Sequence, residues 1–191
     1  MTAPDPRSPD DAVVHDVRDL LARDDRAAAL HALFAAYGAE VFGLLVGVLD
    51  DTRLADEVYA DVVAQVSDEL AHFEWACSLR VWLYGIARAA LRARRKREHR
   101  PSDQATRDNT RASRALRPVV VAVRRGLSEE ERELLILRID RELDWTQLAL
   151  VELGSDASTP EVATEARRMS ARFDKLVERV RDLAELALKQ R

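Results

Sequence analysis

Apolar residues recur every three or four positions along most of this chain, and this spacing limits the folds open to it. Two long stretches, residues 27–49 and residues 54–70, have this spacing. An α-helix turns once in about 3.6 residues, so the spacing gives each stretch one apolar face. Six glycines, six prolines and 5% aromatic residues also leave little material for hairpin turns and strands. We therefore predict an all-α protein. Over residues 27–49 the apolar positions are Leu30, Leu33, Phe34, Tyr37, Val41, Leu44, Leu45 and Val48.

Capping residues and breaks divide the 191 residues into two predicted helical domains. Residues 98–117 show little periodicity and are rich in Ser, Thr, Asp, Asn and Arg, which is typical of a linker. We expect an acidic arm with the start of the first helix, a helical domain, a basic linker and a second helical domain, over residues 1–25, 26–97, 98–117 and 118–191. The expected helices span residues 12–23, 27–49, 54–70, 79–97, 118–126, 129–141, 145–153 and 161–189.

The net charge of −4 hides an uneven distribution along the chain. Residues 1–91 hold 7 basic and 16 acidic side chains, whereas residues 92–125 hold 12 basic and 3 acidic ones. Residues 126–191 hold 11 basic and 15 acidic side chains. The middle block begins Arg92-Ala-Arg-Arg-Lys-Arg97, and such a block can bind phosphates with release of counterions. The alternative is a solvated linker.

Several function classes are disfavoured by what the sequence lacks. The first 25 residues contain seven aspartates and no basic segment followed by an apolar core, so they do not resemble a signal peptide. The longest apolar run, Val41–Leu49, is nine residues long, whereas a membrane span needs about 20. We expect a cytoplasmic protein without membrane insertion. Gly43 and Gly47 in this run indicate close packing of a helix.

The sequence also offers no clear catalytic or metal-binding motif. It has no GxxxxGK[ST] loop, no GxGxxG and no HExxH. Its four histidines are scattered, and the single cysteine, Cys77, lies near no persuasive base. We expect neither an enzyme nor a bound metal or cofactor.

The most informative segment is residues 78–97, where arginines alternate with aromatic residues before a basic tract. On a helix Arg80, Tyr84 and Arg88 lie four residues apart and share a face. Guanidinium groups can bind phosphates while aromatic rings stack on unpaired bases, so the segment suits a nucleic-acid strand. The alternative is an ordinary amphipathic helix with Trp82 and Leu83 in the core.

Four segments resemble, in the same order, the motifs of bacterial extracytoplasmic-function sigma factors. The S-F-R-x-W-L-Y-R-I-A-R-N signature of that family resembles Ser78-Leu-Arg-Val-Trp-Leu-Tyr-Gly-Ile-Ala-Arg88. The family motif A-E-D-L-V-Q-E-V-F is similar to Ala55-Asp-Glu-Val-Tyr-Ala-Asp-Val-Val63. L-P-x-x-x-R-E-V-L-x-L-R resembles residues 127–138, and G-L-S-Y-x-E-I-A resembles residues 142–149.

The resemblance implies a sigma region-two-like domain, a region-four-like helix-turn-helix domain and a set of binding residues. The implied partners are core RNA polymerase, through its β′ coiled coil and β flap, and promoter DNA; an anti-sigma factor is left open. Polymerase docking would fall to Asp56, Glu57 and Asp61. Recognition of the minus-ten element would fall to Phe73, Trp75, Arg80, Trp82, Tyr84, Arg88, Arg92, Arg94 and Arg95. Binding of minus-thirty-five DNA would fall to Arg167, Arg168, Arg172 and Lys175.

The chain departs from the family pattern at several places. Ala60 replaces a glutamine of the docking helix, and Gly85 and Ala89 replace an arginine and an asparagine of the signature. The turn before the last helix is also different, so that helix is expected to begin early, near Glu161. Three functions therefore stay open: a promoter-specific sigma factor, a sigma-like regulator or decoy that binds polymerase without recognising promoters, and a helix-turn-helix repressor.

Overall fold

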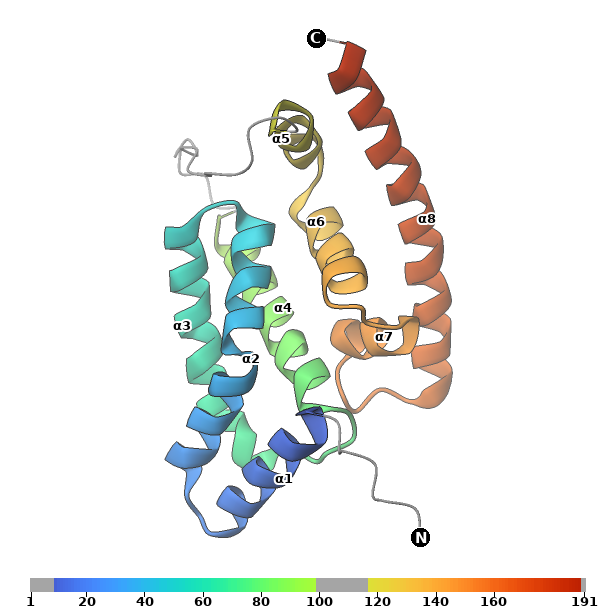
Figure 1. Ribbon diagram of the computed structural model, residues 1–191. Coiled ribbons are helices and arrows are strands. Elements are labelled where there is room, and N and C mark those ends of the chain that lie inside the picture. Colours follow the sequence, from blue (N-terminus) through green and yellow to red (C-terminus); the bar gives the residue numbers. More distant parts are fainter. Residues whose placement is uncertain (1–8, 99–116, 190–191) are drawn as a thin grey trace, which may run out of the picture.

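The computed structural model describes residues 9–98 and 117–189, and in this part of the chain every regular element is helical. The all-α prediction is confirmed. An N-terminal half of four α-helices stands beside a C-terminal half of four more (Figure 1). The first half contains α1 (Pro9–Ala22), α2 (Arg26–Leu49), α3 (Thr52–Glu69), the short η1 (Leu70–His72) and α4 (Leu79–Glu98). The second contains α5 (Arg117–Gly126), α6 (Glu129–Leu135), η2 (Ile136–Asp140), α7 (Trp145–Leu153) and α8 (Thr159–Lys189).

Local capping explains most of these boundaries. Asp25 and Asp51 accept hydrogen bonds from the first turns of α2 and α3, while Ser128 and Asp144 form capping boxes at α6 and α7. Gly154 ends α7 at a positive φ of 104°. The predicted linker, residues 98–117, lies almost wholly outside the described residues, as do residues 1–8 of the acidic arm.

One predicted helix, residues 129–141, is not a single α-helix. It changes at Ile136 into a π-helical turn, in which the Arg141 amide donates to the Ile136 carbonyl at 3.0 Å. Glu142 then adopts a φ of 56° and ends the helix. The added residue in a π turn changes the direction of the side chains that follow.

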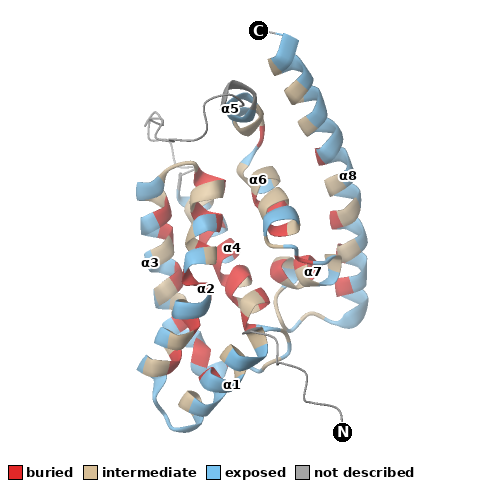
Figure 2. Cartoon of the chain, viewed as in Figure 1, coloured by how far each residue is buried: buried red, intermediate tan, exposed pale blue. Residues whose placement is uncertain are grey.

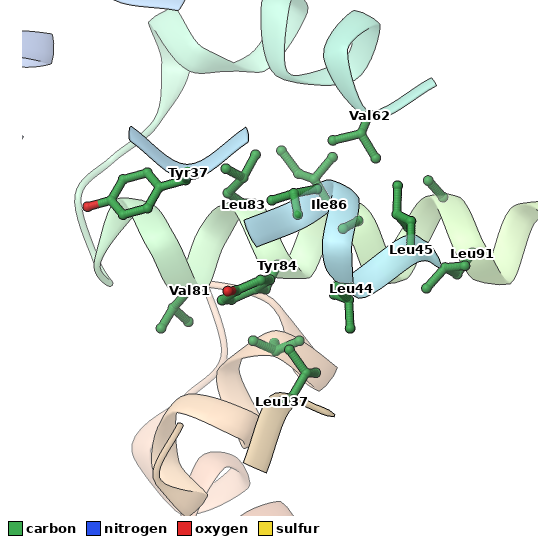
Figure 3. Packing of buried hydrophobic residues seen from close by; sticks show 14 of the residues in the cluster. Tyr37, Leu44, Leu45, Val62, Val81, Leu83, Tyr84, Ile86, Leu91 and Leu137 are labelled. Atoms are coloured by element: carbon green, nitrogen blue, oxygen red, sulfur yellow. The ribbon is translucent and has the colours of Figure 1, made fainter. Parts of the chain in front are cut away.

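The buried residues of α2, α3 and α4 face one another and form the centre of the N-terminal half (Figure 2). Leu83 and Ile86 point from α4 toward Tyr37 of α2 and Val62 of α3 (Figure 3). Tyr84 points to the opposite side of α4, toward the C-terminal half. One helix therefore uses two faces: one for its own half and one for the other half.

The two halves are packed against each other along α4–α7, α2–α6 and α2–η2. Leu137 of η2 lies against Leu44 of α2 and Tyr84 of α4 (Figure 3), and each of the three side chains is almost fully buried. Nearly all of the buried apolar residues that the structure describes, from both halves, thus form a single cluster. The division into two independent domains stays a prediction.

By length and mean hydropathy alone, α2 is the one helix of the described residues that could cross a membrane. Core helices of soluble proteins pass the same test, and here the apolar residues of α2 pack against α1, α3, α4 and α6.

Candidate nucleic-acid interface

The face of α4 that sequence analysis assigned to DNA is turned toward the C-terminal half. Arg88 is 5% exposed and Tyr84 1%, whereas Arg92 is exposed. Arg80, Arg94 and Arg95 are partly buried. The structure therefore brings these residues together on one helix, and most of them contact protein groups.

Glu40 of α2 binds two side chains in the first turns of α4. Its carboxylate accepts hydrogen bonds from Arg80 Nε at 2.9 Å and from Tyr84 Oη at 2.7 Å. Its backbone carbonyl accepts one from Arg141 Nη2 of the C-terminal half at 3.1 Å. Burial raises the pKa of Glu40, but the hydrogen bonds from Tyr84 and Arg80 outweigh it and bring that pKa below the ordinary glutamate value. The carboxylate thus stays charged and fixes both side chains.

A Glu40→Gln variant is expected to be less sensitive to acid. A carboxyl whose pKa is lowered by folding stabilises the protein above its ordinary pKa, and this contribution is lost as the pH falls through the lowered value. The amide should cost about 1–2 kcal/mol at neutral pH, where charged hydrogen bonds are lost, and progressively less in acid. Urea unfolding at neutral and acidic pH would measure this, with exposed Glu178→Gln as the control. An unchanged pH dependence would contradict the assignment.

Arg88 is the centre of an ion-pair network between the halves. Its Nη1 donates to Glu133 Oε1 of α6 at 2.6 Å, and its Nη2 donates to Glu152 of α7. Glu152 also accepts a hydrogen bond from Arg92. Glu133 is fully buried. Charged groups buried this way depend on their partners, because each would lose several kcal/mol if left alone.

The two glutamates respond differently to this environment. Burial raises the pKa of Glu133 despite the positive charges of Arg88 and Arg95. Burial also raises the pKa of Glu152, but Arg88 and Arg92 outweigh it and leave that pKa below the ordinary value. The charge of Glu152 is therefore compensated by Arg88 and Arg92 of α4.

The basic end of α4 continues the same pattern. Arg94 Nη1 lies 3.2 Å from Glu129 Oε1 of α6. Arg95 lies 3.8–3.9 Å from carboxylate oxygens of Glu129, Glu130 and Glu133. We call Arg88, Arg92, Arg94 and Arg95 the arginine row, and Glu129, Glu133 and Glu152 the glutamate row.

Small residues allow this close approach. A Cβ on Gly47 of α2 would lie 2.6 Å from Ile136 Cδ1, and one on Gly43 would lie 3.0 Å from Arg141 Nη2. A Cβ on Gly85 of α4 would lie 3.9 Å from the Val151 carbonyl oxygen of α7, an ordinary contact distance, so the packing there does not require glycine. The close packing predicted from Gly43 and Gly47 is thus packing against the C-terminal half, and Gly85, which departs from the sigma signature, faces α7.

The predicted stacking residues form an aromatic group before α4. The ring centroids of Phe73 and Trp82 are 4.8 Å apart, and those of Phe73 and Trp75 are 5.0 Å apart. The Arg18 guanidinium of α1 lies 4.2 Å from the centre of the Trp75 ring. Phe73 is buried, and Trp75 and Trp82 are partly buried. Trp75 has a φ of 61°, which an aromatic residue adopts rarely.

The remaining predicted residues are exposed. Asp56, Glu57 and Asp61 lie on the outer face of α3, where Glu57 pairs with Arg53 and Asp61 accepts from Arg97 at 2.8 Å. Helix α8 begins at Thr159, close to the early start that was expected near Glu161. Its four predicted DNA-binding residues are exposed: Arg167, Arg168, Arg172 and Lys175. Glu161 is bound to Ser158 in its first turn, and Glu165 is buried.

The acidic side of this interface was not predicted from the sequence. Glu40, Glu133 and Glu152 carry no local signal, since each looks like one more acid on an amphipathic helix. Within the described ranges, no cluster of His, Cys, Asp and Glu side chains is arranged to hold a metal ion. Comparison with family models and with curated proteins found no match to this chain.

Proposed function

We propose that this chain is a bacterial sigma factor of the extracytoplasmic-function group, which directs RNA polymerase to promoters and assists their melting. The observation that carries the proposal is one arrangement of three surfaces. An acidic exposed face of α3 lies beside α4, whose last turns are strongly basic, and a long helix with exposed arginines, α8, follows α7. Of the four segments that resemble the sigma motifs, one lies on α3 and one on α4, while the other two lie on α6 with η2 and at the start of α7.

Each surface suits one step of initiation. The acidic face of α3 would dock on a basic polymerase surface, where complementary charge sets orientation and association rate. The arginines of α4 would bind phosphates of the melted strand, and the aromatic group would stack on its bases at about 1–3 kcal/mol per base. The basic residues of α8 would hold upstream duplex DNA through its phosphates. The chemistry of transcription would belong to the polymerase.

Reconstitution with core RNA polymerase tests the proposal. Mapping of transcription start sites after overexpression should yield transcripts that share a promoter motif, and the purified chain should produce the same starts with core enzyme in vitro. Failure to bind core enzyme would contradict the proposal and favour a repressor that works without polymerase.

Charge reversal on α3 is expected to weaken polymerase binding. An Asp56→Lys variant places a cation on the docking face, and like charges brought together cost several kcal/mol, so core binding should fall at least about tenfold. Asp174→Lys makes the same charge change on an exposed position of α8 and should leave core binding near the native level. Equal binding by both variants would remove α3 from the docking surface.

One observation favours the decoy as a second candidate function. Glutamates of the same chain pair with Arg80, Arg88 and Arg92. These three cations are therefore less available to DNA phosphates than the sequence predicts. Core binding without any promoter-dependent transcript would support the decoy over the sigma factor.

A further inference from the structure

The arginine row and the glutamate row face each other across the interface between the halves. Phosphates and carboxylates bind arginine through the same charge-assisted hydrogen bonds. The two terminal nitrogens of Arg88 donate hydrogen bonds to Glu133 and Glu152, and Arg92 also donates to Glu152. A nucleic-acid strand cannot bind the buried Arg88 guanidinium while the two glutamates hold it, and at the more exposed Arg92 it must compete with Glu152.

We propose that the C-terminal half is a built-in competitor of nucleic acid, in which the glutamate row occupies the phosphate-binding arginines of α4 until the halves separate. The identity of the competing ligand rests on the proposed function. We call the arrangement with the halves in contact the closed form, and the separated arrangement the open form.

Apolar packing and hydrogen bonds to backbone carbonyls accompany these ion pairs at the interface between the halves. Leu137 is 1% exposed and lies against α2 and α4 (Figure 3). Arg141 and Arg124 cross from the C-terminal half to the backbone carbonyls of Glu40 and Gly47, at 3.1 and 3.2 Å. Apolar, backbone and ionic contacts therefore all favour the closed form.

The connection to α4 makes the competition intramolecular. The arginine row lies in the second half of α4, and the next described element, α5, already belongs to the other half. A tethered competitor acts at a high effective concentration, so weak contacts suffice to compete with DNA. When only a fraction of molecules is open, the apparent dissociation constant for DNA rises by the inverse of that fraction.

A Gly47→Gln variant tests the proposal without changing charge. The two atoms nearest to a Cβ at this position, Cδ1 at 2.6 Å and Cγ1 at 3.7 Å, belong to Ile136 of the C-terminal half. Glutamine also favours helix over glycine, so α2 itself should be stabilised. Ala35→Gln, on an exposed position of the same helix, is the matched control. Binding of a fluorescein-labelled random-sequence single strand is followed by anisotropy, and small-angle scattering reports the separation of the halves.

We expect Gly47→Gln to bind the strand at least about tenfold more tightly than Ala35→Gln. This factor corresponds to a native chain in which about a tenth or less of the molecules are open. Its scattering radius should be larger. Release of four arginines should steepen the dependence of log K on log salt by about two to three, given about 0.7 for each phosphate bound in a single strand.

A second variant addresses the ion pairs directly. Glu152→Gln removes the carboxylate that Arg88 and Arg92 share, and Glu178→Gln removes the same charge from an exposed position of α8. Tighter strand binding by Glu152→Gln than by Glu178→Gln supports the proposal. The proposal is overturned when neither Gly47→Gln nor Glu152→Gln binds the strand more tightly than its control. That outcome leaves the proposed function intact if the native chain still directs transcription, whereas tighter strand binding without transcription would support competition and contradict the sigma-factor function.

Discussion

Replacement of Arg88 by methionine is expected to destabilise the closed form by about 3–5 kcal/mol, the usual cost of removing one partner from a buried ion pair. Among the described residues, the fully buried Glu133 would keep one cationic partner, Arg95 at 3.8 Å. Glu152 would keep Arg92. The chain can relieve this cost by separating its halves, because both carboxylates then reach water. We therefore expect a lower melting temperature and a larger radius of gyration in scattering.

A double variant distinguishes a buried ion pair from an exposed one. Replacing a whole buried pair by apolar residues of similar size is often neutral. Arg88→Met combined with Glu133→Met should therefore regain much of the stability and compactness lost by Arg88→Met. An Arg88→Met loss below about 1 kcal/mol, as for exposed pairs, would show that the network contributes little to closure.

The fold was largely predictable because its signals are local. Apolar spacing and caps depend on residues within a turn or two, so the helix expected over residues 145–153 is observed as α7, Trp145–Leu153. Apart from the change to a π turn at Ile136, the other boundaries lie within about three residues of the expected positions. The π turn at Ile136 was missed, because no local residue pattern distinguishes it from a continuing α-helix.

The candidate site was predictable on one side only. The spacing of Arg80, Tyr84 and Arg88 placed them on one face of α4, but nothing local shows what that face contacts. Glu133 lies 45 positions and Glu152 64 positions away from Arg88 in sequence. Pairing over such distances depends on the packing of whole helices, which periodicity does not encode. Gly43 and Gly47 indicated that α2 is approached closely without indicating by which element.

Position 83 gives the contrasting case, a side chain that supports one half and takes no part in the interface. A Leu83→Ala variant is expected to lose about 3 kcal/mol of unfolding free energy, since a buried leucine loses both its transfer free energy and the packing around the remaining cavity. Leu83 is fully buried and points toward Tyr37 and Val62, on the side of α4 away from Leu137 (Figure 3). Urea unfolding measures the loss.

Two controls define what this loss means. Leu83→Met keeps the volume and should cost less than about 1.5 kcal/mol, while Leu186→Ala, at a 59% exposed position of α8, should stay within about 0.5 kcal/mol of the native value. Because Leu83 faces α2 and α3, its truncation should weaken the N-terminal half without opening the interface, and the native scattering radius should not change. Arg88→Met should change that radius. A radius that increases equally in both variants would mean that closure depends on the general stability of α4, and the arginine row would then have no specific part in holding the halves together.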